Sequence, residues 1–257
     1  MQYLFGDTDI AVQRLKVLAQ VFSDTTRAFF LDAAVHKPRL ALDLGCGPGY
    51  STHLLADILQ CDRAAGLDNS EHFISLAQQS KTEQVSFYLH DITSVPFPVG
   101  PGDLLFCRFL LTHLKEPQGM VAKWATQLQP KGLLLMEETE WIDTKKTVFT
   151  TYLEILRAML EHQSNNLYVG PILNGLAETD NLKRRINRVK SLQVSTQQAA
   201  TMFFLNVQAW KHQPFIQAHY STKTISQLEK NLVTLAEQPD SGTEIEWGMR
   251  QVAFERV

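Results

Sequence analysis

A glycine-rich loop is the segment of the sequence best suited to do chemistry. It follows an apolar run and opens a helical pattern, and it reads Leu42-Asp43-Leu44-Gly45-Cys46-Gly47-Pro48-Gly49-Tyr50-Ser51-Thr52. Glycines let the backbone approach a ligand, and a helix N-terminus offers free N–H groups with a partial positive charge. The loop therefore predicts a site for an anionic or polar ligand. Its G-x-G-x-G spacing, with Tyr50 where a dinucleotide fingerprint needs a small residue, disfavours NAD.

Three aspartates stand where strands are expected to end. Asp43 precedes the loop, Asp68 ends the second apolar run and Asp91 follows the third. Because the carboxyl ends of parallel strands share one edge of a sheet, we expect these acids along that edge. Asp68 is placed to accept ribose hydroxyls, and Asp91 to accept an adenine amino group. Isolated strand-end aspartates are also common caps and turn formers, which is the alternative for each.

The elements that position these residues alternate between strand and helix. Apolar runs predict strands at 40–44, 63–68, 85–90, 103–108 and 133–138, with helices at 51–59, about 70–80 and about 120–128 between them. Two helices are expected within residues 1–36, separated at Ser23–Asp24. Continuous apolar strands separated by helices indicate a doubly wound, mainly parallel α/β sheet that is covered on both faces.

The second half of the sequence predicts helices added to the same sheet. Helical patterns near 149–159, 199–210 and 225–235 belong to a cap over 145–240, which includes a candidate sixth strand at 186–194, and alternation near 245–249 predicts a last strand within 241–257. With N-terminal helices over 1–36 and a cofactor-binding core over 37–144, we expect a single domain over 1–257. A cap after the fifth strand would lie over the carboxyl edge, where ligands bind.

Composition excludes several classes of protein. The chain has 257 residues, a formal net charge of −3 and three cysteines without metal-ligand spacing. We expect reduced thiols, no metal, no secretory signal and no membrane span, and hence a cytoplasmic protein. The acidic balance disfavours nucleic-acid binding. The basic run Lys183–Lys190 could contact phosphate, although a solvated strand edge or loop is favoured.

The ordered motifs resemble class I S-adenosylmethionine-dependent methyltransferases. The resemblance rests on LDLGCGPGYST, GLDNS, LHDITSVPFP, FLLTHLKEP and LQPKGLLLMEE, covers about residues 38–138, and is strongest to small-molecule enzymes similar to the menaquinone and ubiquinone methyltransferases. It implies a Rossmann-like sheet of seven strands whose last strand is antiparallel. It also implies S-adenosyl-L-methionine as the cofactor. Motifs of adenine N6 and cytosine C5 methyltransferases and of catecholate enzymes are absent.

The resemblance also assigns site residues. Asp43, Gly45, Cys46 and Gly47 would surround the methionine part of the cofactor, Asp68 the ribose, and Asn69, Asp91 and Ile92 the adenine, whereas Arg108, Phe109 and His113 would line the methyl end. At the N-terminus, Tyr3 belongs to a Tyr-x-x-Gly lead-in. Arg14 is a candidate for the methionine carboxylate, which a guanidinium binds well.

The expected reaction is methyl transfer to a small, largely apolar metabolite, for which the protein must position the acceptor and exclude water. His113 is a candidate general base, and a helix-start histidine bonded to backbone is its alternative. Glu138 and Trp141 are candidate substrate contacts, and Tyr152, Phe203 and Trp210 are aromatic residues that either line the cap or pack its core. A non-catalytic binding protein and a nucleotide-dependent oxidoreductase are the rival functions. The acceptor atom and the oligomeric state stay open.

Overall fold

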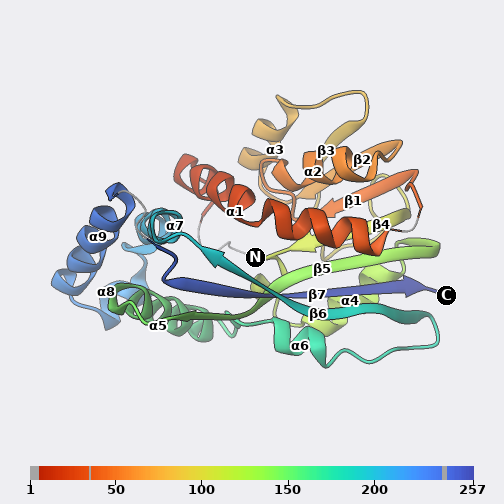
Figure 1. Cartoon of the computed structure of the whole chain (residues 1–257). Helices are drawn as coiled ribbons and strands as arrows, with labels where there is room; N and C mark the ends of the chain where they lie inside the picture. Colours follow the sequence, from red (N-terminus) through yellow and green to blue (C-terminus); the bar gives the residue numbers. More distant parts are fainter. Residues whose placement is uncertain (1–5, 35, 239–241) are drawn as a thin grey trace.

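The computed structural model describes residues 6–34, 36–238 and 242–257, and its centre is one seven-stranded sheet (Figure 1). The strand order is β3-β2-β1-β4-β5-β7-β6. The strands are β1 Leu40–Leu44, β2 Arg63–Asp68, β3 Val85–Leu89, β4 Gly102–Arg108, β5 Leu128–Thr144, β6 Leu182–Val194 and β7 Ile245–Arg256. The first five are parallel, and β7 runs antiparallel to both of its neighbours. The predicted fold, including the sixth strand and the antiparallel last strand, is confirmed.

Helices flank the sheet and extend beyond one end of it. They are α1 Asp9–Ala33, α2 Tyr50–Leu59, α3 Glu71–Gln78, α4 Pro117–Ala125, α5 Thr147–His162, α6 Gly170–Asn174, α7 Thr196–Trp210, α8 Pro214–His219 and α9 Thr222–Glu237, with a 3₁₀ turn at Leu111–His113. Strand β1 is buried throughout, and β2 and β4 are buried along most of their length, because helices cover both faces, whereas the edge strand β3 is exposed at its end. This packing fixes the carboxyl ends of β1, β2 and β4 side by side.

The N-terminal segment differs from the prediction of two helices. One helix, α1, runs without interruption from Asp9 to Ala33. Ser23, the expected break, stays within it because its hydroxyl donates a hydrogen bond to the carbonyl of Gln20 (3.0 Å). The apolar residues on both sides, Phe22 and Phe29, are fully buried, so one continuous face packs on the protein.

Strand β5 is also much longer than the predicted run 133–138. It begins at Leu128 and reaches Thr144, so it also includes Pro130, Lys131 and Gly132. Residues 133–137 of β5 pair with β4 on one side and with β7 on the other. Residues 138–144 continue along β7 alone. This extension carries the chain out past the sheet edge and into the cap.

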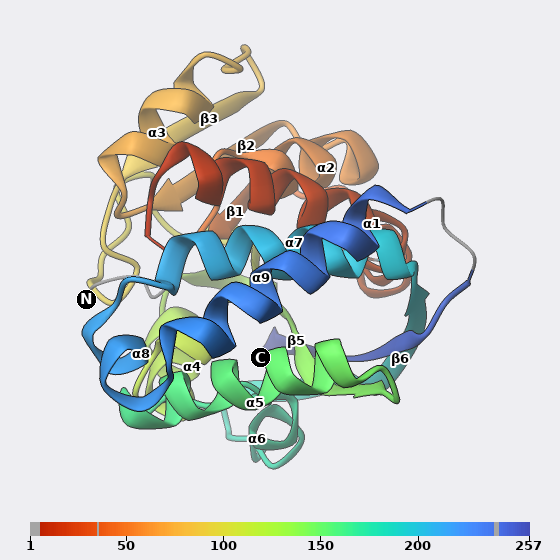
Figure 2. The same ribbon diagram turned by 90° about the vertical axis from the view of Figure 1, so that its left-hand side faces the viewer.

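The cap lies over the carboxyl ends of the parallel strands. Helices α5, α7 and α9 stand together in front of the sheet when it is viewed from that end (Figure 2), and α1 packs along α7. Their shared core contains the fully buried Phe149, Tyr152 and Trp210. The cap is therefore packed firmly on the edge at which the glycine loop lies.

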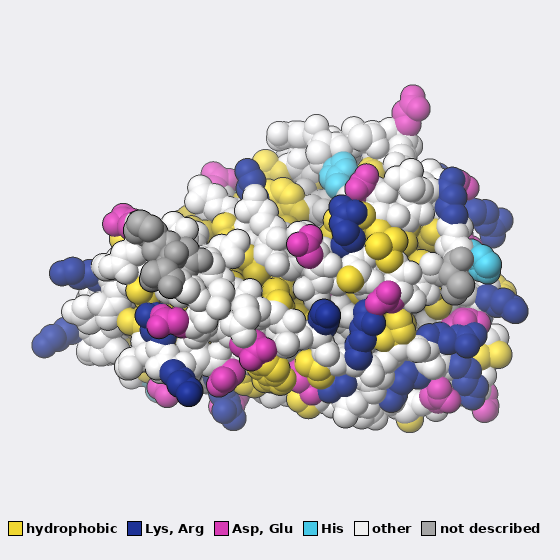
Figure 3. Space-filling view, in the orientation of Figure 1, with side chains coloured by type: hydrophobic (Ala, Val, Ile, Leu, Met, Phe, Trp, Pro, Cys, Tyr) yellow, Lys and Arg dark blue, Asp and Glu magenta, His cyan; other side chains and the backbone are white. Residues whose placement is uncertain are grey.

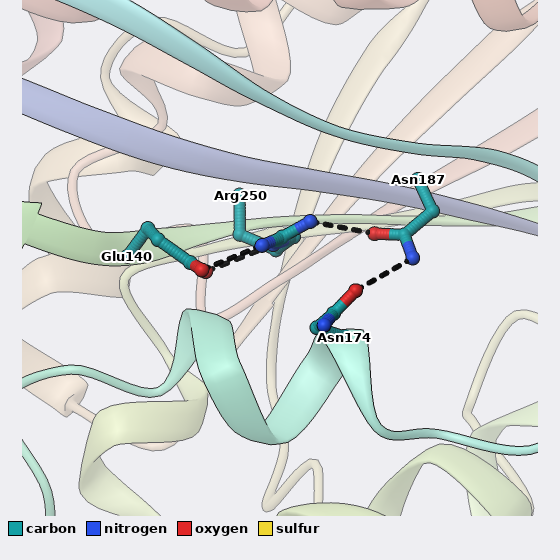
Figure 4. A network of polar contacts seen from close by, with 4 residues as sticks. All are labelled: Glu140, Asn174, Asn187 and Arg250. Carbon is teal, nitrogen blue, oxygen red and sulfur yellow. Dashed lines mark hydrogen bonds and ion pairs between the residues drawn. The ribbon is translucent and has the colours of Figure 1, made fainter.

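A partly buried polar network links β5, β7, β6 and α6 (Figure 4). The guanidinium of Arg250 on β7 donates from Nε to one oxygen of Glu140 (2.8 Å) and from Nη2 to the other (2.5 Å), and from Nη1 to Asn187 on β6 (2.9 Å). Asn187 in turn donates to Asn174 at the end of α6 (2.9 Å). The network therefore joins three strands to α6.

The basic run lies on the edge strand β6, as the favoured alternative predicts. Lys and Arg side chains gather toward the end of the molecule opposite the cap, interspersed with acidic ones (Figure 3). Arg185 pairs with Glu255 (2.6 Å) and Arg188 with Asp32 (2.7 Å). Among the helices within the described ranges, none is long and apolar enough to cross a membrane.

Candidate active site

One cavity of about 530 Å³ lies between the carboxyl edge of the sheet, α1 and the cap. Two parts of it can be distinguished by their walls. The loop chamber is lined by residues 45–51, 68–70 and 91–93. The cap chamber is lined by α5 and α7 together with Phe22, Ile142, Leu167 and Trp247. Arg14, Arg108, Phe109 and His113 also line the cavity.

Backbone hydrogen bonds to β2 fix the conformation of the glycine loop. The N–H groups of Gly45 and Cys46 both donate to the carbonyl of Leu67 on β2 (2.8 and 3.1 Å). Gly45 and Gly47 have φ values of 69° and 52°, which side-chain-bearing residues rarely adopt. A Cβ on Gly45 would lie 2.7 Å from Leu110 Cδ1. The loop thus presents bare backbone to the cavity.

Asp43 lies beneath the loop and is not part of the cavity wall. Its Oδ2 accepts hydrogen bonds from the hydroxyls of Ser51 and Thr52, both at 2.7 Å, which ties the strand to the first turn of α2. Burial raises the pKa of this carboxyl to about 6, and the two hydroxyls and Arg108 oppose that shift. The structure therefore gives Asp43 a supporting position under the methionine end of the expected site.

Asp68 lies at the cavity wall with its carboxylate turned toward the loop. Oδ2 accepts the N–H of Gly47 (2.8 Å) and Oδ1 that of Ser70 (2.9 Å). Burial raises the pKa of Asp68 despite these bonds. A carboxylate has about four acceptor positions, so lone pairs remain for a ligand. Asn69, Asp91 and Ile92 line the same chamber, as expected of neighbours at one sheet edge.

Four further predicted residues meet where the two chambers join. Arg14 of α1 is 6% exposed, and its charge lowers the pKa of His113, which burial already lowers, to about 3. Arg108 at the end of β4 donates from Nη1 to the hydroxyl of Thr26 (2.7 Å), and Thr26 donates to the buried Glu137. Phe109, with a φ of 53°, turns the chain from β4 into the cavity wall.

The two residues predicted as substrate contacts lie away from the cavity wall. Oε1 of Glu138 accepts the N–H groups of Leu110 and Leu111 (2.8 Å each), so this side chain holds the loop after β4. Trp141 packs on Gly248, where no Cβ could fit. Of the predicted aromatic residues, Tyr152 and Phe203 line the cavity, whereas Trp210 is buried behind it. Tyr3 lies outside the described residues.

Sequence reasoning missed several cavity residues. Asp7 accepts a hydrogen bond from Ser70 at the mouth of the loop chamber (3.0 Å), and Asn206 and Trp247 line the cap chamber. The alternation of Ile245, Trp247 and Met249 placed Trp247 on one face of a strand, but not which element that face would meet. No group of three or more potential ligands that could hold a metal ion occurs within residues 6–34, 36–238 and 242–257.

Comparison with known proteins shows what this chain is similar to. Residues 42–136, less than half of the chain, match the methyltransferase domain family model. Trans-aconitate 2-methyltransferase of Delftia acidovorans is 35% identical over 103 residues, covering 38% of this chain and 37% of that protein. An uncharacterized protein in a transposon of Streptomyces fradiae is 31% identical over 153 residues, covering 56% of this chain and 44% of that protein. The matched part of this chain thus spans less than half the length of these curated relatives.

Solved structures share the fold of this chain over nearly its whole length. Coclaurine N-methyltransferase bound to N-methylheliamine and SAH has a TM-score of 0.55 at 16% identity, covering 91% of this chain and 72% of that one. Mycolic acid cyclopropane synthase has a TM-score of 0.55 at 17% identity, covering 90% and 88%. At such identities the likeness concerns the fold alone.

S-adenosylmethionine is the methyl donor of class I methyltransferases, whose motifs this sequence resembles, and the loop chamber fits it. The bare backbone at Gly45 and Gly47 leaves room for a ligand against the loop. Asp68 keeps acceptor positions for a diol, and Asp91 and Ile92 supply an acceptor and an apolar face nearby. A guanidinium, that of Arg14, lines the cavity as a partner for a carboxylate.

Proposed function

We propose that the protein transfers a methyl group from S-adenosylmethionine to a small, largely apolar metabolite. The observation that supports this most is the continuity of the cavity, which joins a polar chamber at the glycine loop to an apolar chamber beneath the cap. A methyl donor and its acceptor must be held in contact and away from water, and a two-part cavity closed by helices provides that arrangement.

The bound sulfonium supplies an already activated methyl group, so the chain's own residues chiefly bind and orient. Asp68 binds the ribose hydroxyls, Asn69, Asp91 and Ile92 hold the adenine, and Arg14 binds the methionine carboxylate. Gly45, Cys46 and Gly47 lie along the methionine part, with Asp43 supporting them from below. Arg108 and Phe109 wall off the methyl end, where Arg108 is fixed by Thr26.

His113 acts, in this proposal, as a neutral imidazole beside the methyl end. Its pKa of about 3 keeps it uncharged throughout the physiological range, and an imidazole with so low a pKa is a weak base, so it orients the acceptor and does not remove a proton from it. His113→Leu, which removes the polar ring, should therefore lower kcat, while cofactor affinity stays within about twofold. An unchanged kcat in that variant would leave His113 a structural residue.

The decisive experiment measures S-adenosylhomocysteine binding by calorimetry. Asp68→Ala should weaken binding by roughly tenfold to a hundredfold, because charged hydrogen bonds to the ribose are lost. Asp62→Ala is the matched control, since Asp62 precedes the same strand but pairs at the surface with Lys37 (2.6 Å). Failure of the wild-type protein to bind S-adenosylhomocysteine would overturn the proposal. Transfer of a labelled methyl group from S-adenosylmethionine to an apolar product would support the proposed reaction directly.

A further inference from the structure

The cap chamber is walled by aromatic rings from four parts of the chain. Phe22 of α1 meets Phe109 edge-on with ring centres 4.9 Å apart, and it meets Trp247 of β7 at 5.7 Å. Tyr152 of α5 stacks on Phe203 of α7 at 3.9 Å and 15°. Phe203 also reaches Trp247, at 5.8 Å. Such walls favour a planar ligand, either neutral or cationic, because ring faces stack on π systems and attract cations.

The charges around the chamber decide between those two ligands. None of the described residues that line it from α5, α7 or β7 is ionised. Arg14 lies at its junction with the loop chamber, close enough to act electrostatically on both His113 and Tyr152. A cationic amine would be placed near this guanidinium without a counter-ion. A polyanion would lose its hydration in a chamber that has no cations of its own beyond the junction.

Two buried polar atoms in the chamber lack hydrogen-bond partners among the described residues. The side chain of Asn206 donates from Nδ2 to the hydroxyl of Tyr152, but its Oδ1 has no partner. The indole N–H of Trp247 has none either. Both residues are 7% exposed and both line the cavity. Buried polar groups are normally satisfied, so an unpaired acceptor and an unpaired donor in one chamber indicate a ligand that supplies their complements.

We propose that the methyl acceptor is an uncharged, planar molecule carrying a hydroxyl and a carbonyl group, recognised through Asn206 and Trp247. The hydroxyl donates to Oδ1 of Asn206, and the carbonyl accepts from the indole N–H of Trp247. The rings of Tyr152 and Phe203 hold the apolar body. This substrate class rests on the proposed function and makes Asn206 and Trp247 specificity-determining residues.

The test compares three naphthalene probes on the protein saturated with S-adenosylhomocysteine. They are neutral 6-hydroxy-2-acetonaphthone, whose hydroxyl and carbonyl groups are too far apart to bond to each other, anionic naphthalene-2,3-dicarboxylate and cationic 2-(aminomethyl)naphthalene, titrated by calorimetry at pH 7. The neutral probe should bind at least tenfold more tightly than either charged one. Asn206→Leu and Trp247→Phe should each weaken it by about tenfold, the value of one lost hydrogen bond, without changing the affinity for S-adenosylhomocysteine.

Two matched variants control for loss of packing. Asn165 and Trp210 also carry a buried polar atom without a described partner, but neither lines the cavity. Asn165→Leu and Trp210→Phe should therefore leave the affinity for the neutral probe within about twofold. Tighter binding of a charged probe, no binding of the neutral probe, or equal losses in the matched variants would overturn the inference. Because every titration requires bound S-adenosylhomocysteine, failure at that first step would instead refute the proposed function.

Discussion

The two chambers of the cavity are built by different means. The loop chamber is formed by residues that directly follow β1, β2 and β3, so each polar side chain is placed by the end of a neighbouring parallel strand. The cap chamber brings together α1, α5, α7 and β7, whose residues are up to about two hundred positions apart in the sequence. One chamber is thus a property of the sheet edge. The other depends on how long-range elements pack.

A substitution in the glycine loop should produce the largest effect, a loss of S-adenosylhomocysteine affinity. Gly47 has a φ of 52°, and a Cβ there would lie 3.3 Å from Leu15 Cδ1, so Gly47→Val forces a strained side chain between the loop and α1. We expect S-adenosylhomocysteine affinity to fall by more than about a hundredfold in calorimetry. Gly100→Val is the control, because Gly100 has a similar φ of 80° but open space around it and lies off the cavity. Comparable binding by the two variants would contradict the assignment of the loop.

The difference between the chambers also explains what could be predicted from sequence. Strand ends and glycine spacing are local signals, and the predicted Asp68, Asn69, Asp91 and Ile92 all line the cavity. Whether Trp141 or Trp247 lines the cavity depends on the pairing of distant strands, which no local sequence signal reveals. The pairing of β5 with β7 shifts register between Thr139 and Trp141, so Glu140 is an extra residue in a bulge. A one-residue shift reverses which face each side chain meets, and alternation alone cannot reveal it.

The ion pair at that bulge, between Glu140 and Arg250, lies off the cavity wall, so breaking it should affect stability more than binding. The side chains of Arg250 and Glu140 are 10% and 15% exposed. Arg250→Met would leave a carboxylate nearly buried without a counter-ion, which should cost about 3 kcal/mol of unfolding free energy. Denaturant titration measures this loss, and S-adenosylhomocysteine affinity should stay within about twofold.

Adding Glu140→Leu to Arg250→Met should recover part of that stability, because no unpaired charge then remains. A double variant less stable than Arg250→Met would contradict this account of the network. A large loss of S-adenosylhomocysteine affinity in either variant would instead show that the loop chamber depends on the bulge.

Glu138 offers a pH-dependent test of the loop after β4, where the chambers meet. Burial raises its pKa to about 8 from an ordinary value of 4.5, with Glu137 adding to the shift. The folded state therefore binds the proton more tightly than the unfolded state, and this group's contribution to stability is full below pH 4.5 and falls as pH rises toward 8. Glu138→Gln keeps an oxygen for the N–H groups of Leu110 and Leu111 but removes the titration.

We expect Glu138→Gln to gain stability over the wild-type protein between pH 5 and pH 7, by about 2 kcal/mol. Urea unfolding of both proteins at the two pH values isolates this group, because other titrations cancel in the difference. A gap between the two proteins that stays constant with pH would show that the carboxyl is ionised in the fold and held by its hydrogen bonds.

The smallest effect on stability is expected from substitutions on β6, a strand that lines neither chamber. Arg185 and Arg188 pair with Glu255 and Asp32 at the surface, where water screens the attraction and ordering the side chains costs entropy. Arg185→Gln and Arg188→Gln should each lower the unfolding free energy by less than about 1 kcal/mol. S-adenosylhomocysteine affinity should not change, because neither side chain lines the cavity.

A double variant that combines Arg185→Gln with Arg188→Gln tests the remaining alternative for the basic run. If the wild-type protein bound RNA or DNA with a steep salt dependence, and the variant lost that binding while keeping its cofactor, the run would be a phosphate-contacting surface. The methyl acceptor would then be a nucleic acid bound outside the cap chamber. The substitutions that change stability least are therefore the most informative about substrate class.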